Sequence, residues 1–536
     1  MPPRKKKDPF DIKPVKPEGS VKDRFIKVIK EFADAFKGEQ EISLNSKKVI
    51  IAFLSVVFFI SLLIVAWIEG GRKRVLQYPE AVVTGTNKEC VNCHQNTTPG
   101  IVKQWKESKH SHSGIGCFDC HQAKDGDKDL IAHYNGLNIS TIVSPKDCSV
   151  CHEKQFQEYT NSHHAQGGAI LGSLDNELAE VVEGHVTFDA NGVKTKNSAV
   201  AVSGCLQCHG SEVKVLEGGR LDPDTWPNTG IGRINPDGSK GSCSSCHLRH
   251  NFSIAQARQP EVCGKCHMGP DHPHLEIYME SKHGISFVAN REKFSKEMEN
   301  LKWIPGVDFE SGPTCATCHM GATRDLEITH DVGSRISWNL RPPISEKIDA
   351  ADKAKNIPTK SWQDRRKDMQ VVCESCHSPG WIGNWYNQYD NLIDTYNEKF
   401  ARPATELYNL MRSENLITSD TTFDDEIEFT YFYLWHHEGR RARHGASMMG
   451  PDYTQWHGMF EVADNFYQKF IPQLREVIAR NRAMGGARAE GAERLNAKLQ
   501  AVLNSPMHKW FIGKQSPQEK AARQKERQEF KKRYVQ

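Results

Sequence analysis

All 16 cysteines of this 536-residue chain lie in eight copies of one pattern, in which two cysteines two residues apart are followed directly by histidine. The pairs are Cys90 and Cys93, Cys117 and Cys120, Cys148 and Cys151, Cys205 and Cys208, Cys243 and Cys246, Cys263 and Cys266, Cys315 and Cys318, and Cys373 and Cys376. Structural disulfides do not repeat this spacing, and zinc knuckles need no histidine after each pair. The pattern is typical of covalent heme c attachment, so we expect eight hemes.

The histidine of each motif has a defined role in such a site. Two thioether bonds anchor the porphyrin edge, and the next residue places its imidazole under the iron as the proximal ligand. The proximal histidines are then His94, His121, His152, His209, His247, His267, His319 and His377. Sixteen of the 24 histidines remain, so the count allows an open iron or a full set of distal ligands. The distal candidates are His110, His133, His163, His250, His283, His330, His444 and His457.

Residues 49–68 form an uncharged, apolar stretch. A helix of this length, at about 1.5 Å per residue, spans the hydrocarbon core of a bilayer. The stretch is too long and too far from the N-terminus for an ordinary cleaved signal peptide. Because bacterial c-type hemes are attached outside the cytoplasm, we expect a single-pass protein. The heme domain would lie in the periplasm or an equivalent lumen.

The remaining segments differ in composition. Residues 1–48 are expected to be a cytoplasmic basic tail, with an amphipathic helix from Ser20 to Phe36 that contacts the membrane, a partner or its own protein. Residues 85–380 are predicted to be a mainly α octaheme cytochrome c domain with short helices and long loops. Apolar periodicity in 385–415, 455–482 and 486–505 predicts a heme-free helical part over 381–510. Residues 511–536 are a charged tail, expected to be solvated or disordered, and the net charge of +3 gives no indication of nucleic-acid binding.

Two segments carry candidate catalytic groups. Asp271 and His272 follow the sixth motif directly, and a carboxylate beside an imidazole can make it a proton acceptor near neutral pH. The alternative is that His272 or His274 is a distal heme ligand. The segment 440–460 holds His444, Tyr453 and His457 far from any motif. For Tyr453 the alternative is an ordinary half-buried tyrosine.

The eight motifs combine with GPDHPH after the sixth, GSCSSCHLRH at the fifth and HGASMMGPDYTQWHG near the end of the chain. Together they resemble the octaheme hydroxylamine oxidoreductase family over about residues 85–505. The resemblance implies that the heme of the fourth motif is catalytic and has an open distal face. It implies that Asp271 and His272 manage protons there. It also implies that Tyr453 bonds covalently to the catalytic heme of a neighbouring subunit in a homotrimer.

The resemblance implies an oxidoreductase that oxidises hydroxylamine or hydrazine and passes electrons through seven further hemes. The redox partner would be a cytochrome c or a membrane quinone-linked cytochrome. Relatives that lack the tyrosine tend to reduce nitrite or nitric oxide. A reductive enzyme that forms ammonia with quinol-derived electrons therefore stays open. The membrane anchor favours reduction and Tyr453 favours oxidation. A second alternative is a non-catalytic electron conduit with eight six-coordinate hemes, which the spare histidines permit.

Overall fold

The computed structural model describes residues 21–38, 44–71, 80–172, 174–184, 190–193, 198–337, 354, 360–417 and 422–534. The chain divides into two compact units, Met1–Pro79 and Glu80–Gln536.

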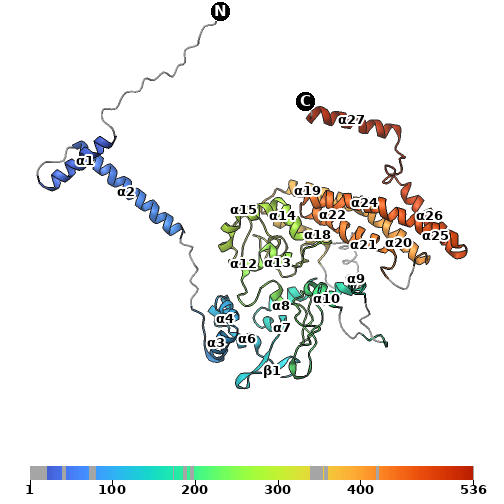
Figure 1. Cartoon of the computed structure of the whole chain (residues 1–536), viewed down its shortest axis with the longest axis horizontal. Coiled ribbons are helices and arrows are strands. Elements are labelled where there is room, and N and C mark those ends of the chain that lie inside the picture. Colours follow the sequence, from blue (N-terminus) through green and yellow to red (C-terminus); the bar gives the residue numbers. More distant parts are fainter. Residues whose placement is uncertain are drawn as a thin grey trace, which may run out of the picture. The chain divides into compact units, whose positions relative to one another are not determined.

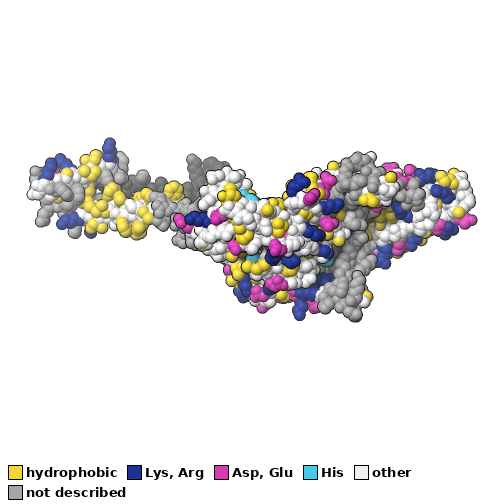
Figure 2. All heavy atoms as spheres, turned by 90° about the horizontal axis from the view of Figure 1, so that it is seen from below, with side chains coloured by type: hydrophobic (Ala, Val, Ile, Leu, Met, Phe, Trp, Pro, Cys, Tyr) yellow, Lys and Arg dark blue, Asp and Glu magenta, His cyan; other side chains and the backbone are white. Residues whose placement is uncertain are grey.

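The first unit contains two helices in contact, α1 (Val21–Phe36) and α2 (Leu44–Gly71). α1 occupies the stretch where an amphipathic helix was predicted, and Ser20, the first residue of that prediction, lies outside the described residues. Gly38 follows in a left-handed conformation with φ of 75°, which glycine adopts without strain. Within α2, residues Ile50–Trp67 are long and apolar enough to cross a membrane, and none of this stretch is buried. Hydrophobic side chains cover much of this unit in Figure 2.

The second unit begins with the eight motifs, which lie on short helices joined by loops (Figure 1). Its α-helices up to the last motif are α3 (Gly85–Thr97), α4 (Pro99–Lys106), α5 (Lys109–His112), α6 (Cys117–His121), α7 (Pro145–Ser149), α8 (Glu153–Thr160), α9 (Leu174–Glu183), α10 (Ala199–Ser203), α11 (Cys205–His209), α12 (Ile254–Ala257), α13 (Pro260–Gly264), α14 (His274–Glu280), α15 (Lys282–Glu297), α16 (Cys315–His319) and α18 (Trp362–Glu374). The 3-10 turns are η1 (Tyr134–Gly136), η2 (Gly167–Gly172), η3 (Glu217–Gly219) and η4 (Cys243–Ser245). One antiparallel hairpin, β1 (Leu130–Ala132) and β2 (Asn138–Ser140), pairs Ile131 with Ile139. The prediction of a mainly helical chain is confirmed.

The part after the last motif is built of longer helices and contains no cysteine. Its elements are α19 (Pro379–Tyr396), η5 (Asn397–Ala401), α20 (Arg402–Ser413), α21 (Glu426–Tyr433), η6 (Leu434–Glu438), α22 (Gly439–Ser447), α23 (Pro451–Thr454), η7 (Gln455–Phe460), α24 (Glu461–Asp464), η8 (Asn465–Phe470), α25 (Ile471–Met484), α26 (Gly486–Leu503) and α27 (Pro517–Tyr534). Four of these, η5 to η8, are π-helical turns inside longer helical stretches.

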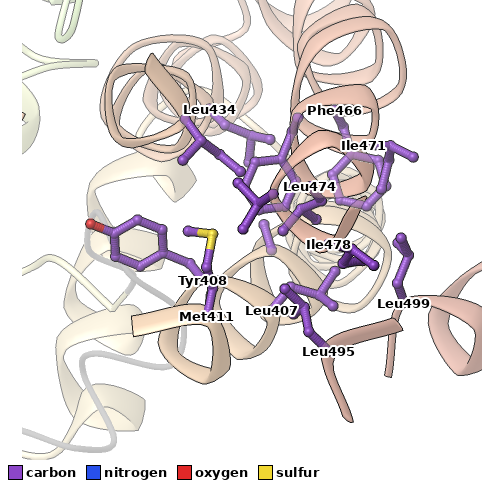
Figure 3. Packing of buried hydrophobic residues seen from close by; sticks show 14 of the residues in the cluster. Leu407, Tyr408, Met411, Leu434, Phe466, Ile471, Leu474, Ile478, Leu495 and Leu499 are labelled. Atoms are coloured by element: carbon purple, nitrogen blue, oxygen red, sulfur yellow. The ribbon is translucent and has the colours of Figure 1, made fainter. Parts of the chain in front are cut away.

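The largest hydrophobic core lies in this heme-free part (Figure 3). Leu407 of α20, Leu434 of η6, Phe466 of η8, Leu474 of α25 and Leu495 of α26 are all fully buried and meet there. Burying one such side chain contributes about 1.5–3 kcal/mol. This core includes Leu434 and so anchors η6, which leads directly into α22.

The charged C-terminal tail contains a helix. α27 is 18 residues long, and none of its residues is buried. Its Ala, Glu, Gln, Lys and Arg residues have high intrinsic helix propensity. The Arg523 guanidinium lies 4.3 Å from the Trp510 ring, and Lys509 pairs with Glu519. These two contacts hold the start of α27 on the preceding loop.

Candidate heme sites and acid–base centre

The local fold of the motifs suits heme attachment. In four motifs the backbone N–H of the histidine donates a hydrogen bond to the backbone carbonyl oxygen of the first cysteine, at 2.9–3.0 Å. These histidines are His152, His247, His267 and His377. In such a helical turn, residues at positions i, i+3 and i+4 share one face, so both thiols and the imidazole point to the same side. No disulfide joins any of the 16 cysteines, all of which the structure describes.

The distance between two facing histidine rings shows whether a heme iron fits between them. Metal–nitrogen bonds of about 2 Å on both faces of an iron set the centroids of two axial imidazoles about 6 Å apart. Four proximal histidines have such a partner: His94 and His133 at 6.2 Å, His152 and His110 at 6.2 Å, His247 and His330 at 6.4 Å, and His377 and His283 at 6.0 Å. These distances fit bis-histidine heme, and all four partners are among the distal candidates.

The second and sixth motifs have neighbours of a similar kind. His250 lies near His121, and burial together with that neighbour lowers the pKa of His250 to about 4. His267 has two histidine rings at 6.1 Å, those of His164 and His272, and the ring of His274 at 5.0 Å. By this distance His272 fits a distal ligand of the sixth motif as well as His164 does. His164 is absent from the sequence-based candidates, which took His163 instead. The histidine doublet at 163–164 was the available signal, and it does not indicate which ring turns inward.

The remaining distal candidates differ in surroundings. His444 is partly buried, but its Nε2 is shielded from solvent and has no hydrogen-bond partner among the described residues, which suits a nitrogen that ligates a metal. Its ring centroid is 4.0 Å from that of His274, too close for an iron between them. His457 is half exposed and contacts Glu461 at 3.0 Å and Asp452 at 3.4 Å. The structure does not bring His457 to a proximal ring within the described residues.

The histidine of the fourth motif is held in place by the backbone around it. The Nδ1 of His209 donates to the carbonyl oxygen of Gly167 at 3.2 Å, which fixes the tautomer and leaves the lone pair on Nε2 for an iron. Gly210 has φ of 86°, and a Cβ there would lie 2.4 Å from the Arg233 nitrogen. Only glycine fits where these backbones meet.

Thiols of different motifs lie close together. Those of the third and fifth motifs, the fourth and sixth, and the sixth and seventh are in hydrogen-bond contact. In four further pairs of motifs, a cysteine of one motif lies close enough to a cysteine of the other to affect its pKa. These pairs are the first and second, the second and third, the fifth and sixth, and the seventh and eighth. The motifs therefore form one continuous series, and the fourth is attached to it through the sixth.

Asp271 and His272 form a tight pair beside the fourth motif. His272 Nδ1 is 2.5 Å from Asp271 Oδ1, and the charges of both residues act on the Cys208 thiol. Burial alone would raise the pKa of Asp271. The hydrogen bond from His272 and the charges of His272, His436 and Arg440 nevertheless hold that pKa well below its usual range. The carboxylate is therefore ionised and orients the imidazole next to Cys208.

The heme-free part supplies groups to this pair that the sequence did not indicate. Arg440 of α22 donates to Asp271 Oδ2 at 3.1 Å and is buried. The Nδ1 of His436, in η6, lies 3.9 Å from the same oxygen. The doublets at 436–437 and 440–441 were the only sequence signals, and tandem basic residues are more often solvated.

Tyr453 lies in α23, away from the pair. Its backbone N–H donates to Glu280 Oε1 at 3.5 Å, and its ring lies 5.5 Å from that of His457. Trp456 and Phe460 follow at helical spacing, 57% and 53% exposed. Tyr453, Trp456 and Phe460 are called the aromatic row below. An exposed apolar row of this kind is typical of a protein–protein interface.

Residues 235–423, which contain four of the eight motifs, match the family model described as seven times multi-haem cytochrome CxxCH. A curated relative from Kuenenia stuttgartiensis, a probable nitrite reductase-hydroxylamine oxidoreductase fusion protein, is 26% identical over 351 residues. That match covers 59% of this chain and 37% of the relative. The chain is therefore similar to multiheme c-type cytochromes over residues 235–423, and it spans little more than a third of the length of this relative.

One solved structure has a similar fold, and a second is more distant. A hypothetical multiheme protein has a TM-score of 0.62 and 27% identity, over 76% of this chain and 98% of that one. A chain of the Kuenenia stuttgartiensis reducing HAO-like protein complex Kustc0457/Kustc0458 has a TM-score of 0.48 and 21% identity, covering 78% and 87% of the two chains. Covalent heme c is the cofactor of this multiheme family, and the motif turns and histidine pairs fit it.

Proposed function

We propose that the chain is a membrane-anchored octaheme oxidoreductase that oxidises hydroxylamine or hydrazine at the heme of Cys205, Cys208 and His209. The observation that supports it is the Asp271–His272 pair, held at 2.5 Å beside Cys208. A buried, ionised carboxylate bonded to an imidazole is suited to accept protons, which a purely electron-conducting chain does not need.

When bound, the hemes supply an iron for the substrate nitrogen and a route for single electrons. The chain's residues do the rest. His209 is oriented by Gly167. His272 accepts protons from the substrate, and Asp271 stabilises the imidazolium that forms. Arg440 keeps Asp271 ionised and fixed in place. The contact between Cys208 and Cys266 would hold the hemes of the fourth and sixth motifs next to each other, and the redox partner would be a cytochrome c or a quinone-linked cytochrome.

The direction of reaction is tested by mixing the purified protein with substrates under anaerobic conditions. Oxidised protein should show heme reduction on addition of hydroxylamine, recorded by absorbance. Prereduced protein should be reoxidised by nitrite or nitric oxide much more slowly. Reoxidation by nitrite with formation of ammonia, without hydroxylamine oxidation, would assign the reductive alternative. Reaction with neither class of substrate would leave only a conduit.

Heme content gives a second prediction. Mass spectrometry should show eight covalent hemes, because each motif forms the turn or lies on the short helix that attachment requires. Electron paramagnetic resonance of the oxidised protein should show one high-spin iron among low-spin ones. Changing His209 to Ala should abolish turnover and retain most of the low-spin signal. A spectrum with low-spin iron alone would contradict an open site.

A third prediction concerns attachment to the membrane. Removing residues 1–79, with a cleavable signal sequence supplied, should release a soluble, heme-loaded protein, because the second unit starts at Glu80 and the candidate span ends at Trp67. Removal of residues 1–43 alone keeps the span and should leave the protein in the membrane fraction. Retention of the longer truncation there would show that another part of the protein or a partner binds the membrane.

A further inference from the structure

The Asp271 carboxylate has a second side, which faces away from His272. Its Oδ1 contacts His272, whereas its Oδ2 contacts Arg440 and lies 3.9 Å from the Nδ1 of His436. Any proton that His272 accepts must leave a site that is mostly buried. The His272 side chain is 27% exposed, and the groups around Oδ2 offer protons a second way out, through the heme-free part.

His436 and His437 follow one another in the π-helical turn η6. Such turns are rare and are frequent at functional sites. The His436 side chain is 7% exposed, and its ring stacks on Phe432 at 4.2 Å. The His437 ring lies 5.3 Å from that of His436 and 4.9 Å from that of Tyr433, which is 40% exposed. The two imidazoles thus lead from the buried carboxylate to the surface.

We propose that His436 and His437 are a proton relay between the Asp271–His272 pair and solvent. This inference rests on the proposed function. A neutral imidazole accepts a proton at one nitrogen and donates from the other, so each ring can pass a proton on without net change. The 3.9 Å separation from Asp271 requires one bridging water.

The stoichiometry requires such a path. Oxidation of NH₂OH with H₂O to NO₂⁻ releases five protons and four electrons. The electrons leave through the hemes. Each proton passes from His272, along the Asp271 carboxylate and the water, to Nδ1 of His436. His436 releases a proton to His437, and His437 releases one to bulk water. A reductive reaction would use the same groups in reverse.

Charged groups from three neighbouring segments act on His437. Asp271 acts on it from the segment before α14, His436 from η6, and Arg440 and Arg441 from α22, while the Tyr433 ring of α21 lies 4.9 Å away. Burial, His436 and the two arginines together lower the pKa of His437 to about 4, although Asp271 acts in the opposite direction. His437 is therefore uncharged at neutral pH and carries a proton only during transfer.

The test follows protons directly in full-length, heme-loaded protein. A photosensitiser reduces the hemes by a light flash without substrate, and a pH-indicator dye records proton uptake. His437→Ala should slow uptake at least about tenfold, and added imidazole should restore most of the rate. His436→Gln should slow uptake similarly. His508→Gln is the control, because it removes a buried histidine that contacts Tyr467 in the same helical part. It should leave the rate of proton uptake unchanged.

The same variants are then measured with hydroxylamine. If wild type turns over and the variants show unchanged proton rates, or a slowing that imidazole does not restore, the relay is wrong and the proposed function stands. If wild type turns over neither hydroxylamine nor nitrite, yet proton uptake still depends on His437, the proposed function is wrong and the relay stands. Unchanged denaturation midpoints and heme content exclude a merely structural effect.

Discussion

Changing Asp271 to asparagine should lower turnover with hydroxylamine at least about 100-fold, within the range that a positioned acid or base contributes. Asparagine keeps the size of the side chain and loses the charge that stabilises protonated His272. Steady-state kinetics should show the loss in kcat, because the pair acts on protons released during reaction. Heme content should not change, since Asp271 attaches to no heme.

A matched control separates this role from simple loss of an ion pair. Asp390 forms a two-bond ion pair with Arg366 at 2.7 and 2.9 Å, so Asp390→Asn also removes a partly buried carboxylate. Both variants should lose stability, by about 1–3 kcal/mol for an unsatisfied charged partner. Only Asp271→Asn should lose turnover. Equal losses of turnover in both would contradict a specific role for Asp271.

The low pKa of Asp271 determines how stability and turnover depend on pH. Because the pKa of Asp271 in the folded state lies below its unfolded value of about 4, the ionised carboxylate adds to the free energy of unfolding, and this contribution is complete above the unfolded pKa. This contribution is lost as pH falls through the folded-state pKa. Asp271 therefore stays ionised under mildly acidic conditions and does not set the acid limb of wild-type turnover. Arg440→Met removes one cause of the low pKa, so Asp271 should then protonate at higher pH and an acid limb should appear.

The proximal side of each heme site could be predicted from the sequence because it is local. Cysteine, cysteine and histidine at positions i, i+3 and i+4 share a face wherever a single turn forms. Distal partners are not local. His283 and His377 are 94 residues apart and meet only after folding. Periodicity can indicate that a histidine lies on a helix, but it cannot indicate which iron that helix faces.

The acid–base centre shows the same limit. Asp271 and His272 are adjacent in the chain, and the sequence suffices to pair them. Arg440 lies 169 residues further on, in a part whose predicted role was subunit contact. The hydrophobic core of that part holds η6 through Leu434, and α22, which follows η6 directly, carries the Arg440 that reaches the carboxylate. No composition or motif within residues 436–440 distinguishes such an arginine from one on a solvated helix face.

Changing Tyr453 to phenylalanine should convert a covalent trimer into monomers of about the chain mass of 60.6 kDa plus hemes. Wild-type protein should resist denaturing electrophoresis as an oligomer when stained for heme. The structural reason is the aromatic row: Tyr453 is partly exposed, and Trp456 and Phe460 beside it are more than half exposed. A head-to-tail contact through this row closes into a ring in a trimer, so that every tyrosine reaches a neighbouring subunit.

The other tyrosines of this region provide the control. Tyr431 stacks on Tyr408 at 4.1 Å and contacts Thr405, so it is held within its own subunit. Tyr433 is 40% exposed, and Tyr433→Phe should leave the covalent oligomer intact. If the Tyr453 variant stayed oligomeric and the Tyr433 variant did not, the bond would belong to Tyr433. Monomers in wild type would exclude a crosslink and favour the reductive reaction. With the crosslink removed, Asp271 and His272 remain, so Tyr453→Phe should lose hydroxylamine oxidation yet keep or gain reduction of nitrite or nitric oxide.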